Sequence, residues 1–221
     1  MFTEILDPQR TILLKKLVSS PLLSPFYLGG GTALSLQLGL RVSVDFDFFA
    51  QNKFSPDVLY TDLKQVVPDT KLVYSDRDTC DLLIQQVQVS FFRYPYPLVN
   101  SPVTGDSLFS GLKMASVDDI AAMKLSAIGS RGSRKDFYDL YQIYHIEPGF
   151  QSERLISAVH QKFGQAFDMT YMVMALNYFE NAEAETLPRL FIHADWDQIK
   201  QFFTEEQKKL FAMVQSGFSI P

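Results

Sequence analysis

The chain has 221 residues, of which 47% are hydrophobic and 20% charged, a composition that excludes a disordered protein and indicates a folded globular one. Its formal net charge of −5 excludes a general electrostatic attraction for nucleic acid, so any RNA contact would need a local basic patch. The single cysteine, Cys80, excludes an internal disulfide and any zinc site built on two or more cysteines.

The N-terminal segment, MFTEILDPQRTILLKKL, is amphipathic and carries acidic residues. It therefore differs from a signal peptide, which has a basic region followed by an apolar one. No apolar run in the sequence reaches the roughly 18 residues that a membrane span requires. We expect a cytoplasmic protein without a membrane partner.

The first half of the sequence predicts alternating helices and strands. The expected elements are helices over 8–19, 32–40 and 55–66, and strands over 26–28, 42–49, 70–75, 80–86 and 88–93. Thr32 is placed to cap the second helix. The strand over 42–49 alternates, so its apolar residues, Val44 among them, are expected on a buried face. Ser43, Asp45 and Asp47 then share the opposite face.

The second half of the sequence predicts helices only. Its expected helices are 117–128, 133–145, 151–164, 168–180 and 195–214. A proline-rich connector, YPYPLVNSPVTGDS, separates the halves. We therefore predict an α+β protein, with a mixed sheet and flanking helices over 1–104 and a helical domain over 105–221.

Two features of the first half point to phosphate and metal chemistry. Gly30 and Gly31 lie between a strand and a helix, where backbone amides and the helix N-terminus favour a phosphate. Asp45 and Asp47 are two carboxylates about 7 Å apart on one strand face, and a divalent cation between them would relieve their repulsion. An isolated Asp-x-Asp most often only faces solvent, but its spacing from the glycine turn makes the combination more specific.

The stretch YLGGGTALSLQLGLRVSVDFDFF resembles the signature of the AbiEii/AbiGii-type toxin nucleotidyltransferases, which belong to the DNA polymerase beta-like superfamily. A second stretch, VDDIAAMKLSAIGSRGSRKDFYDLYQI, is similar to the second conserved block of that family. The two blocks together span most of residues 26–145 and occur in the family's order. The resemblance implies a polymerase-beta-like core.

The resemblance also implies a set of site residues. Asp45 and Asp47 would hold the metal, and Lys124 and Asp136 would complete the catalytic set, with Asp136 as a metal ligand or general base. The expected nucleotide-binding residues are Gly30, Gly31, Thr32, Arg41, Ser43 and Arg131. Arg131, Arg134 and Lys135 form the most basic patch, and Asp139 is expected to support a neighbouring Lys or Arg.

One departure from the superfamily pattern concerns the third metal carboxylate, because the strand run at 88–92 (QVSFF) offers no acid. The helical Asp136 is expected to take its place.

The implied reaction transfers a nucleoside monophosphate from an NTP to a hydroxyl acceptor, with Mg²⁺ or Mn²⁺ as cofactor. The resemblance implies RNA, in particular tRNA, as acceptor and a cognate antitoxin as partner. Two alternatives stay open. One is a small-molecule, antibiotic-type nucleotidyltransferase, which the negative net charge favours. The other is a non-catalytic nucleotide-binding module, which the missing strand acid favours.

Overall fold

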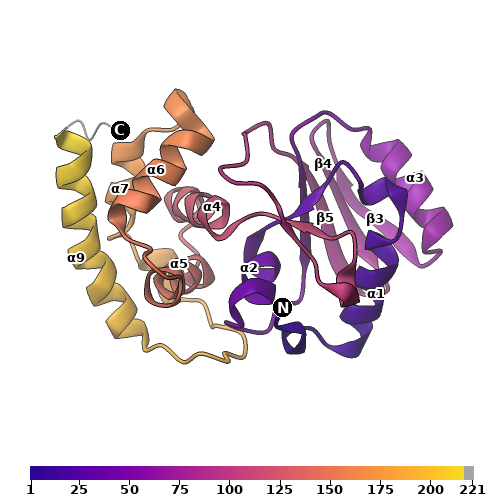
Figure 1. Cartoon of the computed structure of the whole chain (residues 1–221), viewed down its shortest axis with the longest axis horizontal. Helices are drawn as coiled ribbons and strands as arrows, with labels where there is room; N and C mark the ends of the chain where they lie inside the picture. Colours follow the sequence, from indigo (N-terminus) through magenta and orange to yellow (C-terminus); the bar gives the residue numbers. More distant parts are fainter. Residues whose placement is uncertain (217–221) are drawn as a thin grey trace. The chain divides into compact units, whose positions relative to one another are not determined.

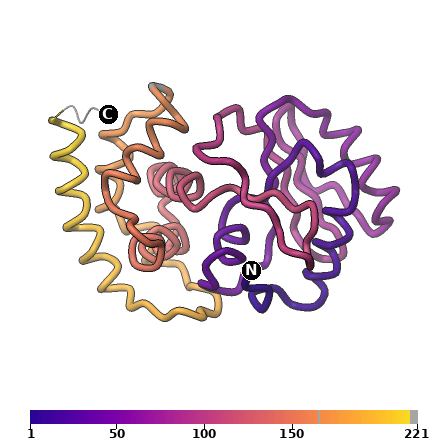
Figure 2. Tube along the Cα trace, viewed as in Figure 1, coloured from indigo at the N-terminus to yellow at the C-terminus, as the bar shows by residue number. Residues whose placement is uncertain are grey.

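A computed structural model describes residues 1–216 and separates the chain into an α/β unit, Met1–Ser116, and a helical unit, Val117–Pro221 (Figure 1). Each unit is built from one continuous stretch of chain, as the colouring of Figure 2 shows. The predicted boundary was residue 104, whereas the first unit extends to Ser116, and Met114 pairs with Leu28 in its sheet. No helix in the described part of the chain has the length and hydropathy for crossing a bilayer.

The first unit is organised around a mixed sheet with the strand order β3-β4-β5-β2-β1-β7-β6. Its strands are β1 (Tyr27–Leu28), β2 (Phe46–Ala50), β3 (Thr70–Ser75), β4 (Thr79–Ile84), β5 (Val87–Arg93), β6 (Val103–Thr104) and β7 (Lys113–Met114). Its helices are α1 (Pro8–Val18), α2 (Gly30–Leu38) and α3 (Pro56–Val66). The pairs β2–β5 and β1–β7 are parallel and the others antiparallel, so the predicted α+β class is confirmed.

The two faces of this sheet differ in how deeply their side chains are buried. In β2, Phe46, Phe48 and Ala50 are buried, whereas Asp47 and Phe49 are half-buried. Figure 1 shows α1 and α3 on one side of the sheet and α2 on the other. Alternation along β2 therefore directs Phe46 and Phe48 into the core, and Asp47 and Phe49 towards the second face.

The predicted strand over 42–49 begins later than expected, since β2 starts at Phe46. The two carbonyls directly before it accept hydrogen bonds from side chains. Arg10 Nε donates to the carbonyl of Val44 at 2.8 Å, and the Thr32 hydroxyl donates to the carbonyl of Asp45. Val44 is 43% exposed, so its assignment to a buried face was wrong.

The second unit packs its helices around α4. The helices are α4 (Val117–Ser130), α5 (Arg134–Ile146), α6 (Ser152–Phe163), α7 (Met169–Ala175), α8 (Glu180–Glu183) and α9 (Trp196–Gln215). Helix α4 contacts α5, α6 and α7, while α9 contacts α5, α6 and α7. The predicted helix over 168–180 is interrupted, because α7 ends at Ala175 and α8 begins only at Glu180.

Helix α4 carries two buried charges, and each is neutralised by a neighbouring helix. Asp119 is fully buried and accepts a hydrogen bond from the equally buried Lys162 of α6 at 2.8 Å. Lys124 is paired with carboxylates of α5. A buried charge without such a partner would cost several kcal/mol, so these pairs determine which faces of α4 meet α5 and α6.

Candidate active site

The glycine turn and the Asp47 carboxylate lie against each other in the first unit. The Gly29 amide donates to the Asp47 carbonyl at 2.8 Å, and Gly30 has a φ of +62°. A Cβ on Gly30 would lie 2.9 Å from Asp47 Oδ2, closer than real Cβ atoms come. Glycine at position 30 therefore allows both the left-handed turn and the position of this carboxylate.

Helix α2 begins at this turn. Gly29 is its N-cap residue, and Gly30 and Gly31 are its first two residues. The prediction that Thr32 caps the helix is wrong, since Thr32 lies inside the first turn. Because Gly29 has no side chain with which to cap the helix, the first-turn amides and the positive end of the helix dipole suit an anion.

Thr32 and Ser43 join the start of α2 to the segment that carries Asp45. Thr32 Oγ1 lies 2.5 Å from Ser43 Oγ and also donates to the Asp45 carbonyl. Both side chains are buried, with exposures of 3% for Thr32 and 6% for Ser43. In this arrangement the two hydroxyls hold the backbone of Asp45 against α2.

The remaining predicted residues of the first unit differ in accessibility. Arg41 is buried and donates from Nη1 to the Val42 carbonyl at 3.3 Å. Asp45 is half-buried and precedes β2, so only Asp47 lies in the strand itself. The first unit thus brings together Gly30, Thr32, Ser43 and the two acidic positions, with Arg41 next to Val42.

The strand next to Asp47 carries a serine where a third acid would lie. Asp47 pairs with Ser90 of β5, and Ser90 pairs with Asp81 of β4, so the three form one row. Asp81 was not among the predicted residues, because it lies on β4 and not in the run at 88–92. Two strand spacings separate Asp81 from Asp47, about 10 Å at the backbone.

The donor set at the start of β2 fits a hard divalent cation. No group of three or more His, Cys, Asp or Glu side chains in residues 1–216 could hold a metal by itself. Mg²⁺, however, is commonly held by one or two carboxylates together with water and substrate phosphates. The carboxylate oxygen of Asp47 beside the glycine turn matches that pattern.

The second unit contains a buried cluster of one lysine, one arginine and two aspartates. Lys124 Nζ lies 2.9 Å from Asp136 Oδ1 and 2.6 Å from Asp139 Oδ2. Arg131 binds Asp136 with two nitrogens, Nε at 2.8 Å and Nη2 at 3.0 Å. Both aspartates are fully buried, whereas the Arg131 side chain is 58% exposed. The predicted residues Lys124, Arg131 and Asp136 therefore converge.

The charge state of Asp136 follows from this cluster. Burial raises the pKa of Asp136, but the charges of Lys124 and Arg131 and their hydrogen bonds outweigh burial and hold that pKa well below its usual value. A general base works best with a pKa near the working pH. The geometry therefore disfavours Asp136 as a base and favours it as the residue that positions Lys124 and Arg131.

The basic patch predicted around residue 131 is only partly available to a ligand. Arg134 donates from Nε to the Ala182 carbonyl at 2.8 Å and lies over the Trp196 ring, so it ties α5 to α8 and to the start of α9. Arg131 and Lys135 remain exposed. The prediction that Lys124 and Asp136 complete the same site as Asp45 and Asp47 stays a prediction.

The sequence was compared with known proteins. Residues 12–216 match the family described as "Nucleotidyl transferase AbiEii toxin, Type IV TA system". An uncharacterized protein of Aquifex aeolicus (strain VF5) is 35% identical over 198 residues, which cover 89% of this chain and 93% of that relative.

Solved structures share the fold at low sequence identity. JHP933 from Helicobacter pylori has a TM-score of 0.57 and 16% identity and covers 96% of both chains. MenT4, a nucleotidyltransferase toxin from Mycobacterium tuberculosis H37Rv, has a TM-score of 0.57 and 17% identity, covering 94% of this chain and 82% of its own. At these identities the likeness shows the fold, and it confirms the predicted nucleotidyltransferase-like architecture.

Proposed function

Because the chain belongs to the AbiEii family of nucleotidyl transferase toxins, we propose that it transfers a nucleoside monophosphate from an NTP to a hydroxyl group of RNA, with tRNA as the acceptor. The observation that carries this proposal is the contact between Gly30 and Asp47. A helix N-terminus suited to phosphate and a carboxylate suited to a cation lie side by side, as phosphoryl-type transfer requires.

In the proposed step, the acceptor oxygen forms a bond to the α-phosphorus of the NTP as the bond to the β-phosphate oxygen breaks. Pyrophosphate leaves, and the acceptor proton is released to solvent. The amides of Gly30 and Gly31 bind the triphosphate. Thr32 and Ser43 act by holding the Asp45 backbone in place.

Asp45 and Asp47 are the residues that would hold Mg²⁺, with Mn²⁺ as the alternative ion. When bound, the ion supplies positive charge that neutralises the phosphates and orients them. Asp136 and Asp139 keep Lys124 charged and oriented, and Asp136 does the same for Arg131. The assignment of Asp136 as a metal ligand or general base stays a prediction.

The biological setting follows from the family, whose description places it in type IV toxin–antitoxin systems. We propose that this chain is the toxin of such a pair and that a cognate antitoxin exists. Induced expression in bacteria should then slow growth, and the Asp47→Asn variant should not. Equal growth inhibition by the wild type and by Asp47→Asn would show that toxicity does not depend on the proposed site.

A transfer assay tests the reaction and its acceptor. The protein is incubated with each α-labelled NTP and Mg²⁺, either with total tRNA or with a set of small hydroxylated molecules. We expect label on RNA, whereas label only on a small molecule would support the antibiotic-type alternative. If no label appears, thermal shift decides, since an NTP at 100 times its Kd should stabilise the fold by about 2.7 kcal/mol. A shift without transfer would indicate a non-catalytic module, and the absence of both would overturn nucleotide binding.

A further inference from the structure

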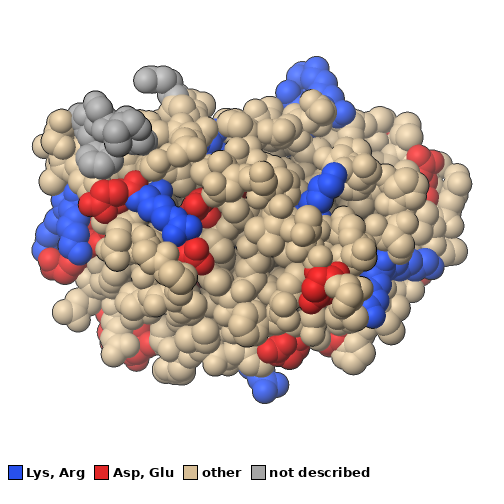
Figure 3. All heavy atoms as spheres, in the orientation of Figure 1, with Lys and Arg blue, Asp and Glu red and all other residues tan. Residues whose placement is uncertain are grey.

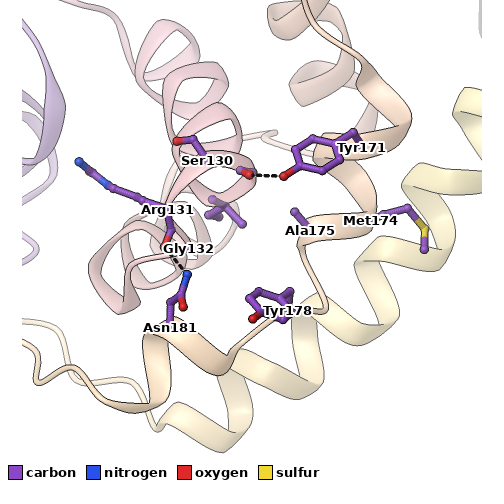
Figure 4. A pocket seen from close by; sticks show the side chains of 10 residues that line it. Ser130, Arg131, Gly132, Tyr171, Met174, Ala175, Tyr178 and Asn181 are labelled. Carbon is purple, nitrogen blue, oxygen red and sulfur yellow. Dashed lines mark hydrogen bonds between the residues drawn. The ribbon is translucent and has the colours of Figure 1, made fainter.

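The helical unit contains a pocket that the proposed reaction does not yet use. It has a volume of about 390 Å³ and lies between the C-terminal end of α4 and the segment from α7 to α8 (Figure 4). Its lining residues are Ile128, Gly129, Ser130, Arg131, Gly132, Tyr171, Met174, Ala175, Tyr178 and Asn181. A volume of this size is typical of sites for small ligands.

An exposed apolar stripe forms one wall of this pocket. Tyr171, Met174, Ala175 and Tyr178 have the spacing i, i+3, i+4 and i+7, which normally marks the buried face of a helix. Here Tyr171 is 62% exposed, Met174 52% and Tyr178 53%. Met172, Val173 and Leu176 instead face the core. The stripe is therefore not part of the core of this unit, and it offers ring faces and a thioether to a ligand.

The opposite wall is mostly backbone. Gly129 and Gly132 have no side chains, and Gly129 packs against the Tyr171 ring, since an added Cβ would lie 3.6 Å from Tyr171 Cε1. Two hydrogen bonds fix the two walls to each other: Tyr171 Oη donates to the Gly129 carbonyl at 3.0 Å, and Asn181 Nδ2 donates to the Arg131 carbonyl at 3.0 Å. Figure 4 shows both bonds, with Ala175 between the two tyrosines.

The pocket is joined to the charged cluster through Arg131. The backbone of Arg131 lines the pocket, whereas its side chain extends away from the tyrosines (Figure 4) and binds Asp136. A ligand with a planar ring and a phosphate could thus place the ring between the walls and the phosphate along the exposed part of Arg131. The Asn181 amide at the rim offers polar groups to the edge of a base.

We propose that this pocket holds an unpaired nucleobase, either of the donor NTP or of the acceptor RNA. Stacking on tyrosine accepts any base, and the amide of Asn181 adds a polar contact at the edge. The inference deepens the proposed function and rests on it for the choice of a nucleotide as ligand. It adds the residues that would select and orient the base.

Methyl NMR of the intact protein tests the inference. The chain has seven methionines, and the signal of Met174 can be assigned with a Met174→Leu variant. Three ligands are titrated separately, so that no transfer occurs: each NTP, single-stranded oligoribonucleotides, and inorganic triphosphate, which lacks a base. We expect the Met174 signal to shift with NTP if the donor base binds there and with RNA if the acceptor base does. No shift with either, or an equal shift with inorganic triphosphate, would overturn the inference.

A pair of tyrosine variants supplies the matched control. Tyr178 and Tyr74 are each 53% exposed, and each hydroxyl bonds to the acid two residues later, Glu180 or Asp76. Tyr178→Ala should weaken binding of the ligand that shifts the Met174 signal by about fivefold or more. Fivefold corresponds to the lower end of the free energy of one base–aromatic stacking contact. Tyr74→Ala on β3 should leave the affinity unchanged. Equal affinities for both variants and the wild type would contradict the pocket assignment.

A second test fills the pocket with a larger side chain. The Ala175→Phe variant should block ligand binding, so the Met174 signal should no longer shift when ligand is added. If that variant does not fold, Tyr178→Ala decides alone. The transfer assay with Asp47→Asn distinguishes the two hypotheses. If the wild type transfers label but the Met174 signal does not shift, only the proposed base site is refuted. If the Met174 signal shifts but no label is transferred, only the proposed reaction is refuted.

Discussion

At position 30 the absence of a side chain determines where a carboxylate can lie. Gly30 has a φ of +62°, and its missing Cβ leaves room for Asp47 Oδ2. We expect Gly30→Ala to abolish transfer, because the added methyl group must displace that carboxylate. Backbone strain should also lower the free energy of unfolding by about 1–2 kcal/mol, as measured by urea unfolding.

Gly149 provides the control for backbone strain. Its φ is +68°, but an added Cβ would have no heavy atom within 4 Å. Gly149→Ala should therefore cost similar stability and retain transfer activity. If both variants lose activity to the same extent, strain and not the position of Asp47 would explain the effect.

Individual residues were predicted from the sequence to different degrees. The proximity of Gly30 and Asp47 was anticipated, because both belong to one short motif in which a strand follows a helix. The roles of Thr32 and Ser43 were not, since no spacing rule reveals that two hydroxyls bond to each other. Asp136 was singled out from the sequence, but its pairing with Lys124 and Arg131 appears only when α4 and α5 are packed together.

At the level of elements, the contact between α4 and α5 depends on charge. We expect Lys124→Met to lower the free energy of unfolding by about 3 kcal/mol at pH 7, because it leaves buried carboxylates without that cation. The pKa of Asp136 is lowered in the folded protein, so its stabilising effect is complete above its unfolded value of about 3.9 and is lost progressively as the pH falls from there towards the lower folded value. The difference between wild type and variant should therefore shrink below about pH 4.

Urea unfolding at pH 7 and at pH 3.5 measures this difference. Lys135→Met, a change at an exposed lysine of α5, should alter stability by less than about 0.5 kcal/mol at both values. A difference for Lys124→Met that does not depend on pH would show that its aliphatic chain, and not its charge, supports the two helices.

The contact between α3 and the sheet can be followed through Cys80. Its thiol is fully buried on β4 and points to the Pro56 carbonyl at 3.7 Å. Burial, with a smaller effect of Asp81 and Asp57, raises the pKa of Cys80 to about 11. We expect no reaction with a thiol reagent at pH 8 until urea opens the unit, because the thiolate is the reactive form. Rapid labelling of the native protein would contradict this packing.

Secondary structure was predicted best where periodicity alone decides it. Helix α3 and strands β3, β4 and β5 lie close to the expected ranges. The start of β2 and the break after α7 were missed for different physical reasons. Before β2, side chains such as Arg10 replace a partner strand. After α7, the apolar stripe continues at helical spacing, but the backbone between Leu176 and Phe179 leaves the helix.

For the whole molecule, charge limits how an RNA acceptor can bind. The net charge is −5, and on the face of the described residues drawn in Figure 3, positive and negative side chains are interspersed without a large area of one sign. RNA binding must therefore rely on a few cations, with Arg131 and Lys135 as exposed candidates. With about two or three phosphate contacts, log K should fall with log salt at a slope between about −1.4 and about −2.7.

The central claim is that Asp47, held beside Gly30, serves nucleotidyl transfer. The measurement that tests it most directly is the rate of transfer from an α-labelled NTP to tRNA by the wild type and by Asp47→Asn, with thermal unfolding of both proteins measured in parallel. We predict that the wild type labels RNA and that the variant is slower by about 100-fold or more, with an unchanged unfolding midpoint. Turnover by Asp47→Asn at the wild-type rate would contradict the assignment of this site.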